Sequence, residues 1–275
     1  MSPPLSISST VKLSSGYEMP MLGVGVYLNE DPIPACEAAL KHGYRHIDTA
    51  EMYGNEEAVG QAIRNSGVKR EDIFITTKIG SELHDDAPAT IDTSLKKLGV
   101  SYIDLYLIHD GMGGKEKRLK AYKALLDAKA AGKIRTVGVS NYAVRHLEEI
   151  REAGYEMPAV NQVELQPFCQ QKDIVEYDKA HGIITSAYCP LIRAKFDNPV
   201  LQEVAKEVNK EVPQVLVRWS LQRGFVPLPK SAKPERVASN ANVYDFELSP
   251  QQMAKIDALD QGTPGAISWN PIDAA

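Results

Sequence analysis

Cysteine is scarce in this sequence of 275 residues, and its placement excludes two kinds of stabilised site. The three cysteines, Cys36, Cys169 and Cys189, are odd in number and far apart, and no two of them form a C-x-x-C pair. A disulfide framework needs paired cysteines, and a structural zinc site needs closely spaced ligands. His46 and Asp48 lie close together, but no third ligand has a usable spacing, so we expect no metal site. The cysteine pattern indicates a reducing compartment.

Long apolar runs and an excess of basic charge are also missing. No stretch approaches the ~18 consecutive apolar residues of a membrane span, and the first ten residues lack the basic and apolar regions of a secretion signal. Lys and Arg number 31 against 36 Asp and Glu, which gives a net charge of −5. A net acidic chain lacks the electrostatic footprint of nucleic-acid binding. We therefore expect a cytoplasmic protein with neither a nucleic acid nor a membrane as a partner.

Apolar segments of strand length alternate with amphipathic helical segments along the chain, after a short hairpin expected over 11–20. The expected strands span 21–25, 44–48, 73–78, 103–109, 134–140, 159–164, 183–188 and 225–228. The expected helices span about 31–42, 56–65, 90–98, 116–131, 143–153, 172–181, 199–223, 233–240 and 249–260. Such alternation indicates a parallel sheet covered by helices, and eight repeats in a chain of this length fit a closed barrel. We predict an α/β protein, a (β/α)8 TIM barrel that forms one domain over 1–275, with an N-terminal β-hairpin and an extra C-terminal helix and tail.

Prolines and capping residues mark several helix ends. Asn198 before Pro199 has the form of an N-cap followed by a helix-starting proline. Ser249 and Gln252 are spaced as a capping box. Pro213 is expected to divide 199–223 into two helices, because proline lacks the N–H that a helix interior needs.

Polar side chains stand where the expected strands end. In barrels of this kind the catalytic residues gather at the carboxyl ends of the strands and in the loops that follow. From the second strand to the eighth, these positions carry Asp48 and Tyr53, Lys78, His109, Ser140 and Asn141, Gln162, Tyr188, and Lys230 and Ser231. The pattern predicts a catalytic site at that end of the barrel.

The segments around these strand ends closely resemble the aldo-keto reductase superfamily, and the resemblance covers about 11–271. They are HIDTAEMYGNE (46–56), TTKI (76–79), LIH (107–109), GVSN (138–141), NQVELQP (161–167), AYCPL (187–191) and PKSAKPERVASN (229–240). Each falls at an expected strand end and in the expected order. The resemblance implies a catalytic tetrad that matches Asp48, Tyr53, Lys78 and His109.

The chemistry of these four side chains fits carbonyl reduction, which needs a hydride donor and an acid for the developing alkoxide. Tyr53 is the acid we expect, and an ammonium beside it is expected to lower the pKa of the phenol. Lys78 would supply that ammonium, with Asp48 as its counter-ion in a partly dry site. His109, as a neutral or charged imidazole, would donate a hydrogen bond to the carbonyl oxygen and orient the substrate.

The resemblance also implies a nicotinamide cofactor. The nicotinamide amide has one acceptor and two donors, which Ser140, Asn141 and Gln162 can satisfy. Tyr188 resembles the tyrosine that stacks on the nicotinamide ring, and Leu191 is expected to contact the cofactor.

The other end of the cofactor would meet the PKSAKPERVASN segment. Lys230, Ser231 and Arg236 resemble the group that holds the adenosine 2′-phosphate, and Asn240 matches an asparagine that contacts adenine. NADPH/NADP+ is therefore the expected cofactor. Ser239 departs from the Glu or Gln common beside that asparagine, which weakens the prediction of strict NADPH selectivity. Arg193 could reach the pyrophosphate or be a solvated loop cation.

The loops that would form the substrate pocket are short. The segments 110–114 and 191–198 predict a shallow, open pocket that accepts bulky ketones. Val26 and Tyr27 line this pocket or pack at the barrel rim, and Trp269 in the tail folds over the site or packs on the surface. Asp110 follows His109 directly. Unless it is paired or turned away, its carboxylate should repel anionic substrates and favour keto-esters, diketones or aldehydes over keto-acids.

Taken together, the sequence predicts an NADPH-dependent oxidoreductase that reduces neutral ketones and aldehydes to alcohols. The same site would oxidise alcohols in reverse. We expect a monomer with a small-molecule carbonyl substrate. The alternative is a non-catalytic nicotinamide-binding sensor or regulatory subunit on the same fold, which an intact tetrad disfavours.

Overall fold

The computed structural model describes residues 4–275, and eight parallel strands form its central sheet. The strands are β3 (Val24–Gly25), β4 (His46–Asp48), β5 (Phe74–Ile79), β6 (Ile103–Ile108), β7 (Ile134–Ser140), β8 (Val160–Glu164), β9 (Ile184–Tyr188) and β10 (Val226–Pro227). Each strand pairs with the next in chain order, so sheet order follows sequence order from β3 to β10. This simple order is that of a parallel barrel.

Contacts between the first and last strands close the barrel. Gly25 and Lys230 form a parallel bridge. The N–H of Gly23 donates to the Pro227 carbonyl, and the N–H of Gly25 donates to the Pro229 carbonyl, both at 3.2 Å. A Cβ on Gly23 would lie 2.6 Å from the Leu228 Cδ2 and 2.8 Å from the ring of the buried His46, so a side chain does not fit at this seam. The predicted (β/α)8 barrel is confirmed.

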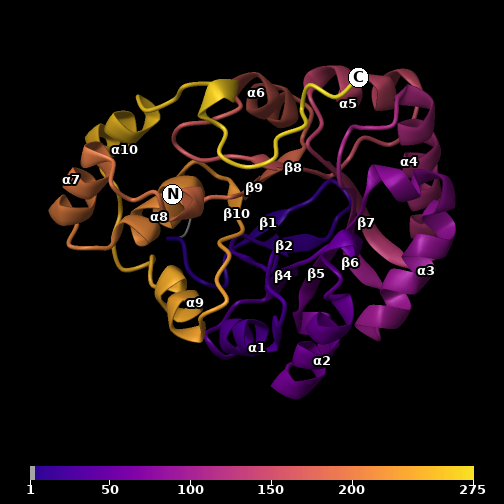
Figure 1. Ribbon diagram of the computed structural model, residues 1–275, viewed down its shortest axis with the longest axis horizontal. Coiled ribbons are helices and arrows are strands. Elements are labelled where there is room, and N and C mark those ends of the chain that lie inside the picture. Colours follow the sequence, from indigo (N-terminus) through magenta and orange to yellow (C-terminus); the bar gives the residue numbers. More distant parts are fainter. Residues whose placement is uncertain (1–3) are drawn as a thin grey trace.

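Helices surround the strands (Figure 1). They are α1 (Ile33–Lys41), α2 (Glu56–Ser66), α3 (Ala87–Leu98), α4 (Lys115–Ala130), α5 (Val144–Glu152), α6 (Lys172–Ala180), α7 (Pro199–Glu207), α8 (Val212–Gln222), α9 (Pro234–Ala241) and α10 (Pro250–Asp257). As predicted, Pro213 lies in the first turn of a new helix, α8, and α10 precedes a C-terminal tail. The predicted caps are also present, since Asn198 accepts from the N–H groups of Val200 and Leu201 and Ser249 accepts from that of Gln252.

A two-stranded hairpin, β1 (Thr10–Lys12) and β2 (Glu18–Pro20), covers the amino end of the barrel. Its buried Leu13 and Met19 pack with Phe74 at the start of β5 and with Val160 at the start of β8. The hairpin therefore does not cover the carboxyl ends of the strands, where the predicted site residues lie.

The predicted boundaries are wrong by a few residues at the seam and at one helix. The first and last strands, β3 and β10, are shorter than the strands predicted over 21–25 and 225–228, because Pro227 and Pro229 have no N–H to extend the ladder. The helix expected over 90–98 begins at Ala87, and its second residue, Pro88, is well suited to a first turn.

Candidate active site

A cavity of about 1750 Å³ lies at the carboxyl ends of the strands. The predicted site residues that line it are Tyr27, Asp48, Tyr53, His109, Ser140, Asn141, Gln162, Tyr188, Leu191, Lys230, Ser231, Arg236, Asn240 and Trp269. Lys78 lies fully buried beneath it. Residues that are far apart in sequence are thus gathered where a barrel places its chemistry.

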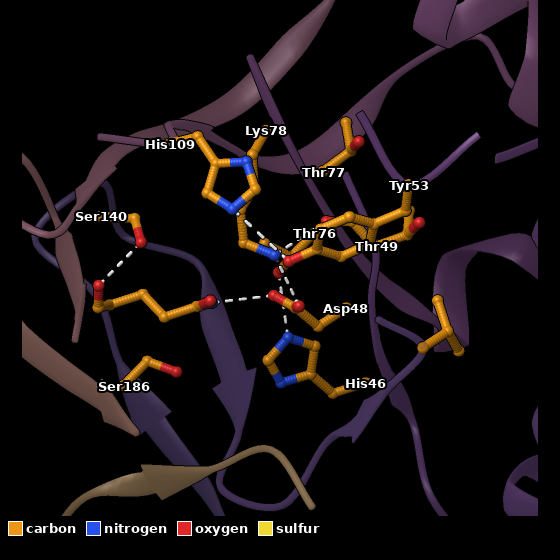
Figure 2. A network of polar contacts seen from close by, with 12 residues as sticks. His46, Asp48, Thr49, Tyr53, Thr76, Thr77, Lys78, His109, Ser140 and Ser186 are labelled. Atoms are coloured by element: carbon orange, nitrogen blue, oxygen red, sulfur yellow. Dashed lines mark hydrogen bonds and ion pairs between the residues drawn. The ribbon is translucent and has the colours of Figure 1, made fainter. Parts of the chain in front are cut away.

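A buried ion pair joins two members of the predicted tetrad (Figure 2). The Lys78 Nζ donates to Asp48 Oδ1 at 2.6 Å and to the Thr49 carbonyl oxygen at 2.8 Å. Burial lowers the pKa of Lys78, and the charge of Asp48 opposes that shift. Each charge is therefore held in place by the other, because removing one would leave the second buried and unpaired.

Tyr53 and His109 meet above this pair. The Tyr53 hydroxyl lies 3.4 Å from His109 Nε2, and the two rings pack edge to face at 5.6 Å. The Lys78 Nζ lies 5.1 Å from the centroid of the Tyr53 ring. Burial, with the charge of Asp48, holds the pKa of Tyr53 well above its usual value. The net lowering of this pKa expected from Lys78 is not found, because desolvation and the charge of Asp48 outweigh any effect of the ammonium, and this favours a protonated phenol.

The surroundings of His109 favour the neutral imidazole. Burial and the nearby charge of Lys78 lower its pKa well below the usual value. Its Nδ1 is buried without a partner among residues 4–275. A buried N–H without an acceptor is rarer than a buried lone pair without a donor, so we assign the proton to Nε2, which faces Tyr53.

Gln162, Ser140, Asn141 and Tyr188 form a continuous hydrogen-bonded network along the cavity floor. Gln162 Nε2 donates to Asp48 Oδ2 at 2.8 Å, and the Ser140 hydroxyl donates to the Gln162 carbonyl at 2.8 Å. Asn141 Nδ2 donates to the His109 carbonyl at 3.0 Å. Asn141 has a φ of 58°, a left-handed conformation that asparagine tolerates better than most residues. Strands β4, β6, β7 and β8 are thereby tied together at their ends.

Exposed cationic side chains stand at the far end of the cavity. Lys230 and Arg236 are exposed, and neither forms an ion pair within residues 4–275. Ser231 and Asn240 are buried beside them. Unpaired cations next to hydrogen-bonding side chains suit phosphate groups, so the donor set fits the anionic end of a dinucleotide. Arg193 lines the same cavity and donates to the Ser268 hydroxyl at 3.0 Å.

The rim near Tyr53 is aromatic and apolar. Tyr27 packs on Tyr53 with ring centroids 4.9 Å apart, and Trp269 packs edge to face with His109 at 6.4 Å. Tyr27, Met52 and Trp269 are each nearly half exposed, with exposed fractions of 46%, 49% and 49%. These side chains form exposed walls at the mouth of the cavity.

Two residues predicted for the substrate pocket do not line the cavity. Val26 is fully buried in the core. Asp110 is 2% exposed, and its carboxylate accepts from the N–H groups of Met112 at 2.9 Å and Ser81 at 3.4 Å. The Asp110 carboxylate is paired and turned away, which removes the reason for expecting it to repel anionic substrates.

A metal ion is not supported by the surroundings of His46 and Asp48. His46 Nε2 is 2.9 Å from the Thr76 hydroxyl, and burial lowers the pKa of this imidazole to about 4. Across residues 4–275, no three His, Cys, Asp or Glu side chains are grouped closely enough to hold a metal. His46 is thus a neutral core residue under Asp48 (Figure 2).

Sequence reasoning missed Glu164. This residue follows Gln162 by two positions, is fully buried at the end of β8, and accepts hydrogen bonds from the C-terminal tail. Its signal in the sequence is a carboxylate inside an otherwise apolar or amide-bearing strand, NQVELQP.

Comparison with known proteins identifies the family and supports the same fold. Residues 21–261 match the model of the Aldo/keto reductase family. The chain belongs to the aldo-keto reductase family. It is 46% identical over 264 residues to a glyoxal reductase of Bacillus subtilis (strain 168), which covers 94% of this chain and 95% of the relative. It is 39% identical over 259 residues to the methylglyoxal reductase DkgA of Escherichia coli (strain K12), covering 92% and 94% respectively.

Solved structures of aldo-keto reductases share the fold. MGS-M4, an aldo-keto reductase from a Medee basin deep-sea metagenome library, has a TM-score of 0.92 at 39% identity and covers 97% of this chain and 99% of its own. An aldo/keto reductase from Brucella melitensis has a TM-score of 0.89 at 40% identity, covering 93% and 99%. Family membership supports an oxidoreductase that acts on small carbonyl compounds with a nicotinamide cofactor. Within residues 4–275, no helix combines the length and apolar character needed to cross a membrane.

Proposed function

We propose that this protein is an NADPH-dependent carbonyl reductase in which Asp48, Tyr53, Lys78 and His109 are the catalytic residues. The observation that carries the proposal is the meeting of the Tyr53 hydroxyl and the His109 imidazole, 3.4 Å apart, over a buried Lys78–Asp48 pair. When bound, a reduced nicotinamide supplies the hydride that the carbonyl carbon accepts.

The protein's own residues would orient the carbonyl and provide the proton. His109 Nε2–H and the Tyr53 hydroxyl face the same point, so both can donate to the oxygen of a substrate carbonyl. As negative charge develops on that oxygen, Tyr53 transfers its proton to it, because an alkoxide is a far stronger base than a phenolate. Lys78 then stabilises the phenolate from beneath, and the paired Asp48 keeps Lys78 charged and in place. The reverse sequence oxidises an alcohol.

The cofactor site that we propose uses the full length of the cavity. Ser140, Asn141 and Gln162 would bind the nicotinamide amide, with Tyr188 stacked on the ring. The Gln162 amide that now donates to Asp48 would have to share or exchange that bond.

At the other end, Lys230, Ser231 and Arg236 would bind the 2′-phosphate, with Leu191 and Asn240 near the adenosine. The unpaired charges of Lys230 and Arg236 support NADPH over NADH, because the 2′-phosphate is what distinguishes the two cofactors.

For the substrate we propose small neutral carbonyl compounds, including α-ketoaldehydes, diketones and keto-esters. The aromatic rim of Tyr27 and Trp269 beside Tyr53 supports apolar or uncharged substituents, and its exposure leaves room for bulky ones. The related glyoxal and methylglyoxal reductases support dicarbonyl substrates.

Turnover separates an enzyme from a nicotinamide-binding sensor. Oxidation of NADPH would be followed with glyoxal, methylglyoxal and an aromatic keto-ester, alongside NADPH binding by fluorescence. An enzyme oxidises NADPH with at least one of these carbonyls and yields the alcohol. Binding of NADPH without turnover of any of them would contradict the proposal and favour a sensor.

A further inference from the structure

The buried carboxylate of Glu164 holds the tail that crosses the cavity. Its Oε1 accepts from the N–H of Ile267 at 2.7 Å, and its Oε2 accepts from the N–H of Ser268 at 2.9 Å. Gln166 Nε2 lies 3.3 Å from Oε1 and donates to the Gly265 carbonyl at 2.9 Å. The tail, coloured yellow after α10 in Figure 1, passes α6 on its way to α5. Glu164 therefore binds it directly before Trp269.

The residue fixed in this way forms a wall of the site. Trp269 packs against His109 with ring centroids 6.4 Å apart. Its carbonyl oxygen lies 2.6 Å from the Tyr188 hydroxyl, which also lies 2.9 Å from Asn141 Oδ1. The single hydroxyl proton can serve only one of these acceptors at a time. The position of the tail is thus coupled to Tyr188 and Asn141 on the barrel side.

A carboxylate is the group that this anchor requires. Glu164 is fully buried and forms no ion pair within residues 4–275, so the N–H groups of the tail are its main compensation for burial. Both oxygens face donors. An amide of the same shape would place an NH2 group against one of the tail N–H groups and leave two donors facing each other.

We propose that Glu164 is a positioning residue for the substrate: it holds the backbone of Ile267 and Ser268 so that Trp269 forms the wall beside His109. This inference rests on the proposed carbonyl reduction at that site. Glu164 contacts neither Tyr53 nor His109, so it acts on substrate binding through the tail and not on the proton transfer.

The kinetic arm compares Glu164→Gln with Arg145→Ala. Arg145 donates to the Ala274 carbonyl at 2.6 Å and holds the tail beyond Trp269, outside the cavity. For 4-nitrobenzaldehyde, Glu164→Gln should raise KM by about tenfold with kcat within about threefold, because substrate binding is lost and proton transfer is not. Arg145→Ala should leave KM within about twofold. The Kd for NADPH should change by less than about threefold in both variants, because the Tyr188 hydroxyl keeps Asn141 Oδ1 as its acceptor when the tail moves.

A spectroscopic arm reports the tail without any turnover. The chain has two tryptophans, and Trp219 is 1% exposed, so acrylamide quenching should report mainly Trp269, with Trp269→Phe identifying its share. Glu164→Gln should increase the quenching of Trp269, and Arg145→Ala should not. This arm holds even if the protein turns over no carbonyl, so the two proposals can fail separately.

A variant in the tail controls for the possibility that Glu164→Gln disturbs folding of the barrel. Ile267→Pro removes one N–H donor to Glu164 and leaves β8 unchanged. It should shift KM and quenching in the same direction as Glu164→Gln, by a smaller factor. Unchanged KM and unchanged Trp269 quenching in both variants would overturn the inference, as would an equal effect of Arg145→Ala.

Discussion

At the scale of single residues, burial determines the protonation states on which the site depends. Desolvation raises the pKa of the half-buried Tyr53 and lowers that of the buried His109, which favours a protonated phenol and a neutral imidazole. Asp48, 2.6 Å from the Lys78 Nζ, opposes the lowering of the Lys78 pKa by burial. A general acid for alkoxide formation needs its proton at neutral pH, and the raised pKa of the half-buried Tyr53 phenol meets that need. The sequence indicates the four residue types but not the direction of these shifts, which depends on packing.

Asp178 offers a test of burial effects away from the cavity. Its carboxylate accepts from the Thr185 hydroxyl at 3.0 Å and from Asn161 Nδ2 at 3.4 Å, and burial raises its pKa to about 7. The folded protein therefore binds this proton more tightly than the unfolded chain. The resulting stability is present below the unfolded pKa and is lost as pH rises toward 7.

Comparison with Asp178→Asn isolates this contribution. Between pH 5 and pH 8, the free energy of unfolding of the wild type should fall relative to that of Asp178→Asn by roughly 2–3 kcal/mol. Urea unfolding of both proteins at each pH measures the difference. Parallel pH profiles would show that Asp178 does not titrate in this window.

At the scale of elements, sequence signals located helix ends better than the barrel seam. Asn198, Pro213 and Ser249 end or begin helices as predicted, because a cap or a missing N–H acts within one turn. The strands that close the barrel are shorter than predicted, because Pro227 and Pro229 have no N–H to extend the ladder. That ladder joins Gly23 to Pro227, about 200 residues later in the chain. The residues next to Gly23 in the sequence do not indicate which distant segment it pairs with.

The C-terminal tail shows the same limit at the site. Its crossing of the cavity could be proposed from Trp269, but its anchor could not, because Glu164 and Ile267 are brought together only by folding. Likewise, Asp110 beside His109 suggested a charged pocket wall, yet the loop turns it onto the N–H groups of Ser81 and Met112. Strand-end position predicts which residues approach the cavity, and loop conformation decides which way they face.

The cap of α7 provides a prediction for an element. Asn198 Oδ1 accepts from Val200 at 3.0 Å and Leu201 at 3.3 Å. Asn198→Ala should lower the free energy of unfolding by about 1 kcal/mol, because those N–H groups lose their acceptor. Asn198→Asp keeps a side-chain acceptor and should lose less than half of that. Equal losses in the two variants, measured by urea unfolding, would rule out the cap as the cause.

At the scale of the whole molecule, an acidic chain is proposed to bind an anionic cofactor. The net charge is −5, so the protein as a whole repels NADPH, whereas Lys230 and Arg236 attract it locally. Screening separates the two effects, because the Debye length falls from about 30 Å at 10 mM salt to about 10 Å at 100 mM. The sign of the salt dependence therefore shows which one dominates.

We expect local attraction to dominate. The KM for NADPH at saturating aldehyde should rise several-fold as NaCl increases from about 10 to about 100 mM. In Arg236→Ala, the KM should be higher throughout and the rise smaller. A KM that falls with added salt would mean that the net charge governs binding.

The most direct measurement of the proposed mechanism compares wild type with Tyr53→Phe. Loss of the proton donor should lower kcat for glyoxal reduction by about 10²–10⁴-fold. The Kd for NADPH, measured by fluorescence, should stay within about twofold, because the hydroxyl donates to substrate and not to the cofactor. Activity of Tyr53→Phe within about threefold of wild type would contradict the assignment of Tyr53 as the acid.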